Sequence, residues 1–100
     1  MQEYKVTVDD DGDVYFYQPG TDIIHRIDGP AVEYANGSKF WYINNERHRL
    51  DGPACEWTNE AKEWYVDGKP HRLDGPAIEY AAGYKAWYVN GNRHRTDGLS

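Results

Sequence analysis

Histidine, arginine and aspartate recur together in this chain at a fixed spacing. The order His-Arg-x-Asp-Gly appears four times, and each copy starts 23 residues after the previous one, at His25, His48, His71 and His94. Imidazole, guanidinium and carboxylate groups placed side by side could bind a phosphate, hold a metal ion or transfer a proton. Recurrence in every copy favours a structural role, because a single site would need only one.

Two interpretations of the motif stay open. In the first, the basic residues form a strip that binds phosphate, a nucleotide or a partner's carboxylates, with His48, Arg49, His71 and Arg72 as candidates. In the second, each arginine pairs with the aspartate of its own motif, and that aspartate caps its Asp-Gly turn. Seven of the eleven Lys and Arg residues lie on or beside these turns, namely Arg26, Arg47, Arg49, Lys69, Arg72, Arg93 and Arg95.

Metal binding does not fit this spacing. Equivalent histidines in neighbouring hairpins would stand roughly 9–10 Å apart, whereas zinc needs its ligands within about 2.0–2.3 Å. An acidic run, Asp9, Asp10, Asp11 and Asp13, lacks the calcium-loop spacing and is interpreted as a solvated turn. We therefore predict no metal site and no cofactor.

Nucleophilic catalysis has no support in the sequence either. Neither serine, Ser38 nor Ser100, follows a nucleophile motif. The single cysteine, Cys55, takes the strand position filled by Val32 and Ile78, so it is interpreted as a small buried apolar residue. We predict that the chain is not an enzyme.

The elements that position these residues follow the same 23-residue period. Three full repeats span 25–47, 48–70 and 71–93, and ten positions are identical in all three: His, Arg, Asp, Gly, Pro, Ala, Glu, Lys, Trp and Tyr. A degenerate hairpin at 4–24 precedes them and a partial repeat at 94–100 follows, so that 1–100 forms a single β-repeat domain.

The sequence of each repeat predicts a β-hairpin. In the first, Asn36-Gly37 separates two short β-rich runs, which predicts a two-residue type I′ turn. Asn59-Glu60 departs from this pattern and predicts a looser turn in the second repeat. Further turns at Asn44-Asn45, Asp67-Gly68 and Asn90-Gly91 lead into the next motif. The predicted fold is all-β, a single-layer extended antiparallel sheet of about four consecutive hairpins.

Composition agrees with a thin sheet that has little interior. Leu, Ile, Val and Phe make up only 16 of 100 residues, mean hydropathy is -0.95 and the net charge is -6. Such values are typical of disorder, but four Trp and nine Tyr at fixed places in the repeat supply the apolar area instead. No apolar run is long enough to span a membrane and the start is no signal peptide, so we expect a cytoplasmic protein.

A two-residue turn assigns the faces of the sheet. It places Val32 opposite Trp41, so that one face would carry Val32, Trp41 and Ile43 and the other Glu33, Phe40 and Tyr42. No helical period offers a cover for the aromatic face, so dimerisation or docking on a target is expected to hide it. The candidate interaction residues are the repeated aromatic and acidic ones, Trp41, Trp64, Trp87, Tyr42, Tyr65, Tyr88, Glu33, Glu56 and Glu79.

The run Trp-Tyr-x-Asn-Gly-x-x-His-Arg-x-Asp-Gly-Pro-Ala-x-Glu-Tyr resembles the MORN repeat in its bacterial and viral variant. The resemblance covers 25–98 closely and 4–24 loosely, although arginine follows each histidine where a common pattern has glycine. It implies an extended antiparallel sheet used for protein association, and variant members include antitoxin-like components and small phage proteins.

These observations favour a non-enzymatic protein-interaction module. Its acidic charge suits an inhibitor, an immunity protein or a phage counter-defence protein that blocks a target protein, acting in the host cytoplasm if phage-encoded. Two alternatives stay open: a binder of a nucleotide or phosphorylated metabolite through the His-Arg edge, and a self-assembling repeat protein such as a homodimer. The acidic balance argues against direct nucleic-acid binding and against an anionic membrane surface.

Overall fold

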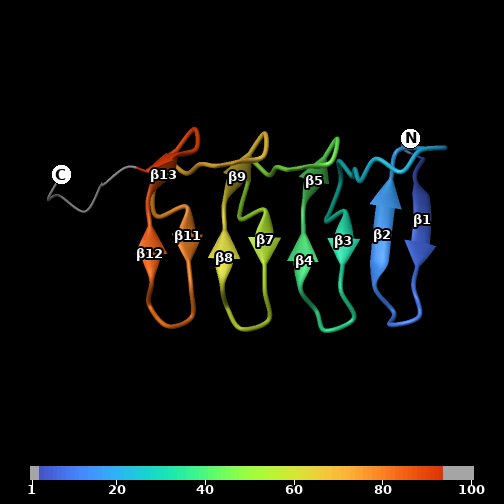
Figure 1. The fold of residues 1–100 in the computed structure, drawn as a ribbon, viewed down its shortest axis with the longest axis horizontal. Coiled ribbons are helices and arrows are strands. Elements are labelled where there is room, and N and C mark those ends of the chain that lie inside the picture. The colour runs from blue at the N-terminus through green and yellow to red at the C-terminus, as the bar shows by residue number, and fades with distance from the viewer. Residues whose placement is uncertain (1–2, 94–100) are drawn as a thin grey trace, which may run out of the picture.

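The chain folds as a row of β-hairpins along one axis, as a computed structural model that describes residues 3–93 shows (Figure 1). Eight short strands form one antiparallel sheet in the order β1-β2-β3-β4-β7-β8-β11-β12. They are β1 (Lys5–Val8), β2 (Val14–Tyr17), β3 (Val32–Glu33), β4 (Lys39–Phe40), β7 (Cys55–Glu56), β8 (Lys62–Glu63), β11 (Ile78–Glu79) and β12 (Lys85–Ala86). The predicted antiparallel sheet of four consecutive hairpins is confirmed.

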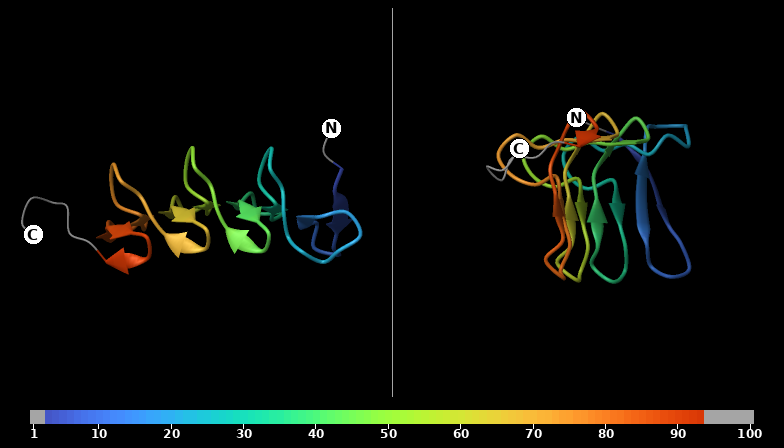
Figure 2. Two further views of the ribbon diagram at one scale, coloured as in Figure 1. Left: turned by 90° about the horizontal axis from the view of Figure 1, so that it is seen from above. Right: turned by 60° about the vertical axis from the view of Figure 1, so that its left-hand side comes forward.

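Three small hairpins, each a two-stranded sheet, accompany the main sheet, at the further turns that the sequence predicts after Tyr42, Tyr65 and Tyr88. Each follows a strand of the main sheet after a single tryptophan that belongs to neither, and pairs β5 (Tyr42–Ile43) with β6 (Glu46–Arg47), β9 (Tyr65–Val66) with β10 (Lys69–Pro70) and β13 (Tyr88–Val89) with β14 (Asn92–Arg93). The second view in Figure 2 shows these hairpins and the loops beside them lying across the top of the longer strands. The chain therefore lies across one end of the main sheet, which remains a single layer.

The turn at Asn36-Gly37 differs from the predicted type I′ turn by one residue. Tyr34 N–H donates to Ser38 O at 2.9 Å and Gly37 N–H donates to Tyr34 O at 2.9 Å, so three residues form the loop. Only Gly37 has a positive φ, of 99°, as in a type I turn followed by a left-handed residue. The asparagine contributes by accepting a bond from Ser38 N–H at 2.9 Å.

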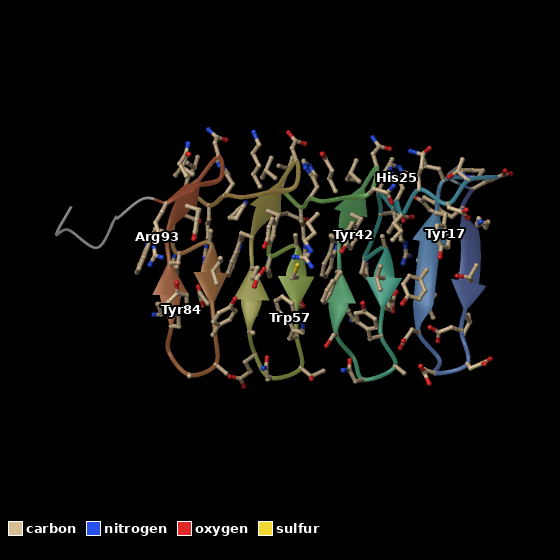
Figure 3. All side chains as sticks on the ribbon, in the orientation of Figure 1. Tyr17, His25, Tyr42, Trp57, Tyr84 and Arg93 are labelled. Carbon is tan, nitrogen blue, oxygen red and sulfur yellow. The ribbon has the colours of Figure 1, made fainter. Side chains whose placement is uncertain are left out.

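This extra residue moves the strand register and corrects the predicted faces. Val32 pairs with Phe40 rather than with Trp41, and a shift of one residue moves a side chain to the opposite face of a strand. Val32, Phe40 and Cys55 consequently form the buried core, and Tyr42, Tyr65 and Trp57 pack against it. Tyr42 lies near the small hairpins and Trp57 nearer the lower turns in Figure 3. Trp41 is not part of this core.

The other main-sheet turns share this three-residue form. Asp9 N–H donates to Asp13 O at 3.0 Å, and Trp57 N–H donates to Ala61 O at 3.0 Å. The turn at Asn59-Glu60 is thus no looser than its equivalents. It does require Glu60 to take the left-handed place of a glycine, with a φ of 73°. The type I′ geometry occurs instead in the small hairpins, where both residues of Asn44-Asn45 have positive φ.

No helix among the described residues is long and apolar enough to cross a bilayer.

Candidate functional site

Arg49 is held by a set of contacts that involves most of its motif. Its Nε donates to Asp51 at 2.9 Å, and its Nη1 donates to Pro53 O at 3.1 Å and to Glu56 at 2.9 Å. The flat guanidinium lies over the Trp41 ring, 3.8 Å from its centre. The hydrogen bond from Arg49 also lowers the pKa of the Asp51 carboxyl below its ordinary value. These contacts connect the loop that contains Asp51 to strand β7, which contains Glu56.

Arg26 and Arg72 repeat this arrangement. Arg72 contacts Asp74, Pro76 O and Glu79 at 3.0, 3.1 and 3.0 Å and lies 3.8 Å from the Trp64 ring centre. In the N-terminal unit, Arg26 makes the same kinds of contact and lies over Phe16 at 4.0 Å. Phe16 therefore takes the place of the tryptophan in this unit.

The position of the arginine explains why the motif has glycine after the aspartate. A Cβ atom built on Gly52 would lie 2.9 Å from Arg49 Cζ, and one on Gly75 would lie 2.9 Å from Arg72 Cζ. Real Cβ atoms do not approach another heavy atom so closely, so any side chain here would displace the guanidinium from its ring.

The histidines also have a structural partner. His48 Nδ1 accepts a hydrogen bond from Asp67 N–H at 3.0 Å, and His71 Nδ1 accepts one from Asn90 N–H at 3.0 Å. His25 does the same for Asn44 N–H at 3.1 Å. Each imidazole thus binds the first residue of the type I′ turn in the next small hairpin.

These contacts bear on the two interpretations of the motif. The guanidinium groups of Arg49 and Arg72 each already face two carboxylates. The Nδ1 atoms of His48 and His71 already accept hydrogen bonds from backbone N–H groups. The geometry supports the structural ladder over the anion strip. It also extends the ladder to Glu33, Glu56 and Glu79, which the sequence predicts as interaction residues. The copy of the motif that begins at His94 lies outside the described residues.

The variable residue of the motif forms an exposed apolar column. Ile27, Leu50 and Leu73 lie in the loops that lead into each hairpin and are 60%, 80% and 79% exposed. The first view in Figure 2 shows these loops projecting at regular intervals. We call the three side chains the loop ridge. Sequence reasoning missed it, although an aliphatic residue between charged turn residues, recurring every 23 positions, was a readable signal.

Two grooves separate the members of the loop ridge. The first has a volume of about 780 Å³, lies between the loops of Ile27 and Leu50 and is also lined by Trp41 and Ile43. The second has a volume of about 740 Å³, lies between the loops of Leu50 and Leu73 and is also lined by Trp64 and Val66. Each combines an aromatic ring with aliphatic walls.

The predicted aromatic interaction residues therefore separate into two groups. Trp41 and Trp64 line the grooves, beneath their arginines. Tyr42 and Tyr65 instead pack against the core on the other side of the sheet. Trp87 and Tyr88 are half-buried, and neither lines a groove described here.

A polar cluster in the second repeat breaks the repeat pattern. Glu63 is 7% exposed at the position of Phe40 and Ala86, and its carboxylate accepts bonds from Tyr65 Oη at 2.8 Å and Tyr80 Oη at 3.1 Å. Burial and then the bond to Glu63 raise the pKa of Tyr65 to about 12. This cluster was not singled out from the sequence, although a glutamate at an otherwise apolar position marks it.

Cys55 lies beside this cluster and is fully buried, as predicted. Burial is the main cause that raises the pKa of its thiol to about 12. A thiol that keeps its proton is a poor nucleophile, so Cys55 serves packing rather than chemistry.

The acidic turn brings together Asp9, Asp11 and Asp13, whose nearest carboxylate oxygens lie within 4.8 Å of one another. Asp9 Oδ1 accepts bonds from the N–H groups of Asp11 and Asp13, both at 3.0 Å, and Asp13 Oδ1 accepts one from Ala35 N–H at 2.8 Å. These carboxylates shape the turn and join it to the next hairpin, which fits the solvated turn we expected.

No family model, curated protein or solved structure matches this chain.

Proposed function

We propose that this chain is a non-enzymatic protein-binding module that docks through the loop ridge and its two grooves. The observation that carries the proposal is the exposure of Leu50 and Leu73 at 80% and 79%. Side chains of this kind contribute most to stability when covered, about 1.5–3 kcal/mol each. Here they are presented to solvent at regular intervals.

The rigidity of the loops supports the proposal. Each loop is fixed by its arginine through two carboxylates, a carbonyl and an aromatic ring. A surface that is already ordered loses little conformational entropy when a partner binds. The arginine contacts therefore hold the loops of Leu50 and Leu73 in position before a partner binds, and most of the entropy of ordering these loops is lost on folding rather than on binding.

The net charge of -6 indicates the character of the target. An acidic module favours a partner with a basic surface through long-range attraction. This fits an inhibitor or counter-defence protein that blocks a basic target in a bacterial cytoplasm, which is the role that the MORN-like resemblance also suggests.

The test is affinity capture from the lysate of cells that naturally contain the chain. The intact wild-type chain is compared with a Leu50→Ser, Leu73→Ser double variant and with Val8→Ser, which removes an apolar residue of 64% exposure far from the ridge. A protein recovered in stoichiometric amount by wild type and Val8→Ser, but not by the double variant, supports the proposal. Equal recovery by all three, or none, overturns it.

A second candidate, binding of a small anion, is favoured at Arg47 rather than at the His-Arg motif. Arg47 contacts Tyr42 Oη, Tyr65 Oη and Glu63 at 3.4, 3.5 and 3.9 Å, longer than the contacts of Arg49. It also lines a shallow groove that contains Lys69 together with the acidic residues Glu46 and Asp67. Titration calorimetry with ADP should give saturable heat that Arg47→Gln abolishes, whereas heat unaffected by this substitution excludes the site.

A further inference from the structure

We infer that the two grooves take a basic, proline-rich peptide segment in the polyproline II conformation, with apolar side chains three residues apart entering successive grooves. This inference rests on the proposed function, because it names the occupant of the same surface. It follows from the spacing of the grooves, from their lining and from their charge.

The spacing is set by the sheet. In the strand order, equivalent strands of neighbouring repeats are two strand spacings apart, and strands lie about 4.7–4.9 Å apart, so the grooves repeat every ~9.5 Å. A polyproline II helix rises about 3.1 Å per residue with three residues per turn. Residues i and i+3 therefore point the same way at a separation of about 9.3 Å, which matches one step along the loop ridge.

Other peptide conformations match this step less well. In an extended strand the residues on one side lie about 6.6–6.8 Å or 13 Å apart. In an α-helix, residues i and i+7 are about 10.5 Å apart, so a helix must cross the repeats at an angle to bring them into register. Only polyproline II gives the required separation while running parallel to the row of hairpins.

The lining of the grooves fits the same occupant. Proline-rich segments dock in shallow grooves with aromatic walls, and each groove here contains one indole, Trp41 in the first and Trp64 in the second. Leu50 stands between the two grooves. The two residues between the inserted ones would cross over Leu50, which would give this side chain contacts on both sides.

Charge defines the flanking residues of the peptide. Arg49 and Arg72 each face two carboxylates, one from the loop aspartate and one from a strand glutamate, so each of these three-residue clusters carries an excess of one negative charge. The aspartates of these pairs point outward, with the side chains of Asp51 and Asp74 86% and 87% exposed. Lysine or arginine residues flanking the apolar ones would meet these carboxylates.

The probes for the test are four fluorescein-labelled peptides with terminal arginines. Three have the same composition and a proline-rich interior, and differ in whether their two leucines are two, three or four residues apart. The fourth is an alanine-based helical peptide with its two leucines seven residues apart. Binding to the intact chain is measured by fluorescence anisotropy. We expect the three-residue spacing to bind at least about tenfold more tightly than the others, since only this spacing seats both leucines in successive grooves.

Two variants locate the binding. Leu50→Ser should weaken the three-residue peptide by about tenfold, whereas Val8→Ser should leave its affinity unchanged. Raising the salt concentration should weaken the binding of the three-residue peptide to the wild-type chain, because the carboxylates that its basic residues contact are exposed.

Three outcomes overturn the inference: equal affinity for all spacings, tightest binding of the helical peptide, or no binding of any peptide. The proposed function fails separately. If no peptide binds but a cellular partner still depends on Leu50 and Leu73, the surface binds proteins through another conformation. If neither peptide nor partner binds, both proposals are wrong.

Discussion

Arg49 covers the ring of Trp41, eight positions before it in the chain, with its guanidinium carbon 3.8 Å from the ring centre. The two residues lie in different sequence repeats, since Trp41 belongs to 25–47 and Arg49 to 48–70. The same relation joins Arg72 to Trp64. This contact links each loop to the preceding hairpin and fixes the position from which the loop ridge projects.

Replacing Arg49 by lysine should destabilise the fold by about 2 kcal/mol, because lysine keeps the charge but loses the planar fork and the stacking on the indole. Urea unfolding followed by tryptophan fluorescence measures the change. Lys62→Arg, at an exposed position, is the control. A loss below about 0.5 kcal/mol, the range of ordinary surface substitutions, would show that the ladder is not structural.

Gly52→Ala should destabilise the chain by about 1–3 kcal/mol, because the added Cβ meets Arg49 Cζ at 2.9 Å. In an Arg49→Ala background the obstacle is gone, so the same substitution should cost much less. A double-mutant cycle from urea unfolding measures this coupling. Additive effects would mean that Gly52 is required for a reason other than the arginine.

Glu60→Gly should stabilise the chain by about 1 kcal/mol, because Glu60 occupies a left-handed conformation that the other main-sheet turns assign to glycine. Thermal unfolding checks the prediction. Glu60→Ala is the matched control: it removes the carboxylate but keeps the Cβ, and should leave stability nearly unchanged. Equal stabilisation by alanine would attribute the effect to the charge instead.

Cys55 should make the fold sensitive to alkali. Its pKa is about 12 in the folded chain and 9.0 ordinarily, so above pH 9 the unfolded chain loses this proton first. The free energy of unfolding should then fall by up to about 1.4 kcal/mol per pH unit between pH 9 and 12. Cys55→Val, the residue of the equivalent strand position, should remove this contribution.

The comparison is made by urea unfolding at several pH values. Tyr65 also titrates late, with a pKa raised to about 12 from 10.0, but it contributes to both proteins and cancels in the difference. Parallel pH profiles for wild type and Cys55→Val would contradict the prediction.

Leu50→Ser should change the free energy of unfolding by less than about 0.5 kcal/mol, because its side chain is already 80% exposed. Urea unfolding of this variant separates binding from folding in the capture and peptide experiments. A large loss of stability would mean that the loop packs against the fold and is unavailable to a partner.

The hairpin row was predictable because glycine, asparagine and proline mark its turns every 23 residues. The register was not, because Asn36-Gly37 suits either a two-residue or a three-residue loop. The Asn59-Glu60 pair distinguishes the two loop lengths. A type I′ turn there would require positive φ at both residues, whereas the three-residue loop requires it only at Glu60.

The candidate site was predicted in part. The pairing of Arg26, Arg49 and Arg72 with the aspartates of their motifs followed from sequence proximity. Their bonds to glutamates seven residues away and their stacking on aromatic rings depend on where the chain bends after the main sheet. The bend lies at Trp41 and its equivalents, and no local pattern marked it.

The pairing of Arg49 with Trp41 also sets how this chain can be shortened or lengthened. Because Trp41 and Trp64 are each covered by an arginine of the following repeat, a segment that ends at position 47 or 70 lacks the arginine for its last tryptophan. Excising 23 consecutive residues between 25 and 93 leaves Trp41 or its repeat equivalent eight positions before an arginine. An excision of another length that begins or ends between Trp41 and Arg49, or between Trp64 and Arg72, separates a tryptophan from its arginine. Whole 23-residue periods are therefore the units in which evolution or engineering can shorten or lengthen this row of hairpins at any point without breaking these pairs.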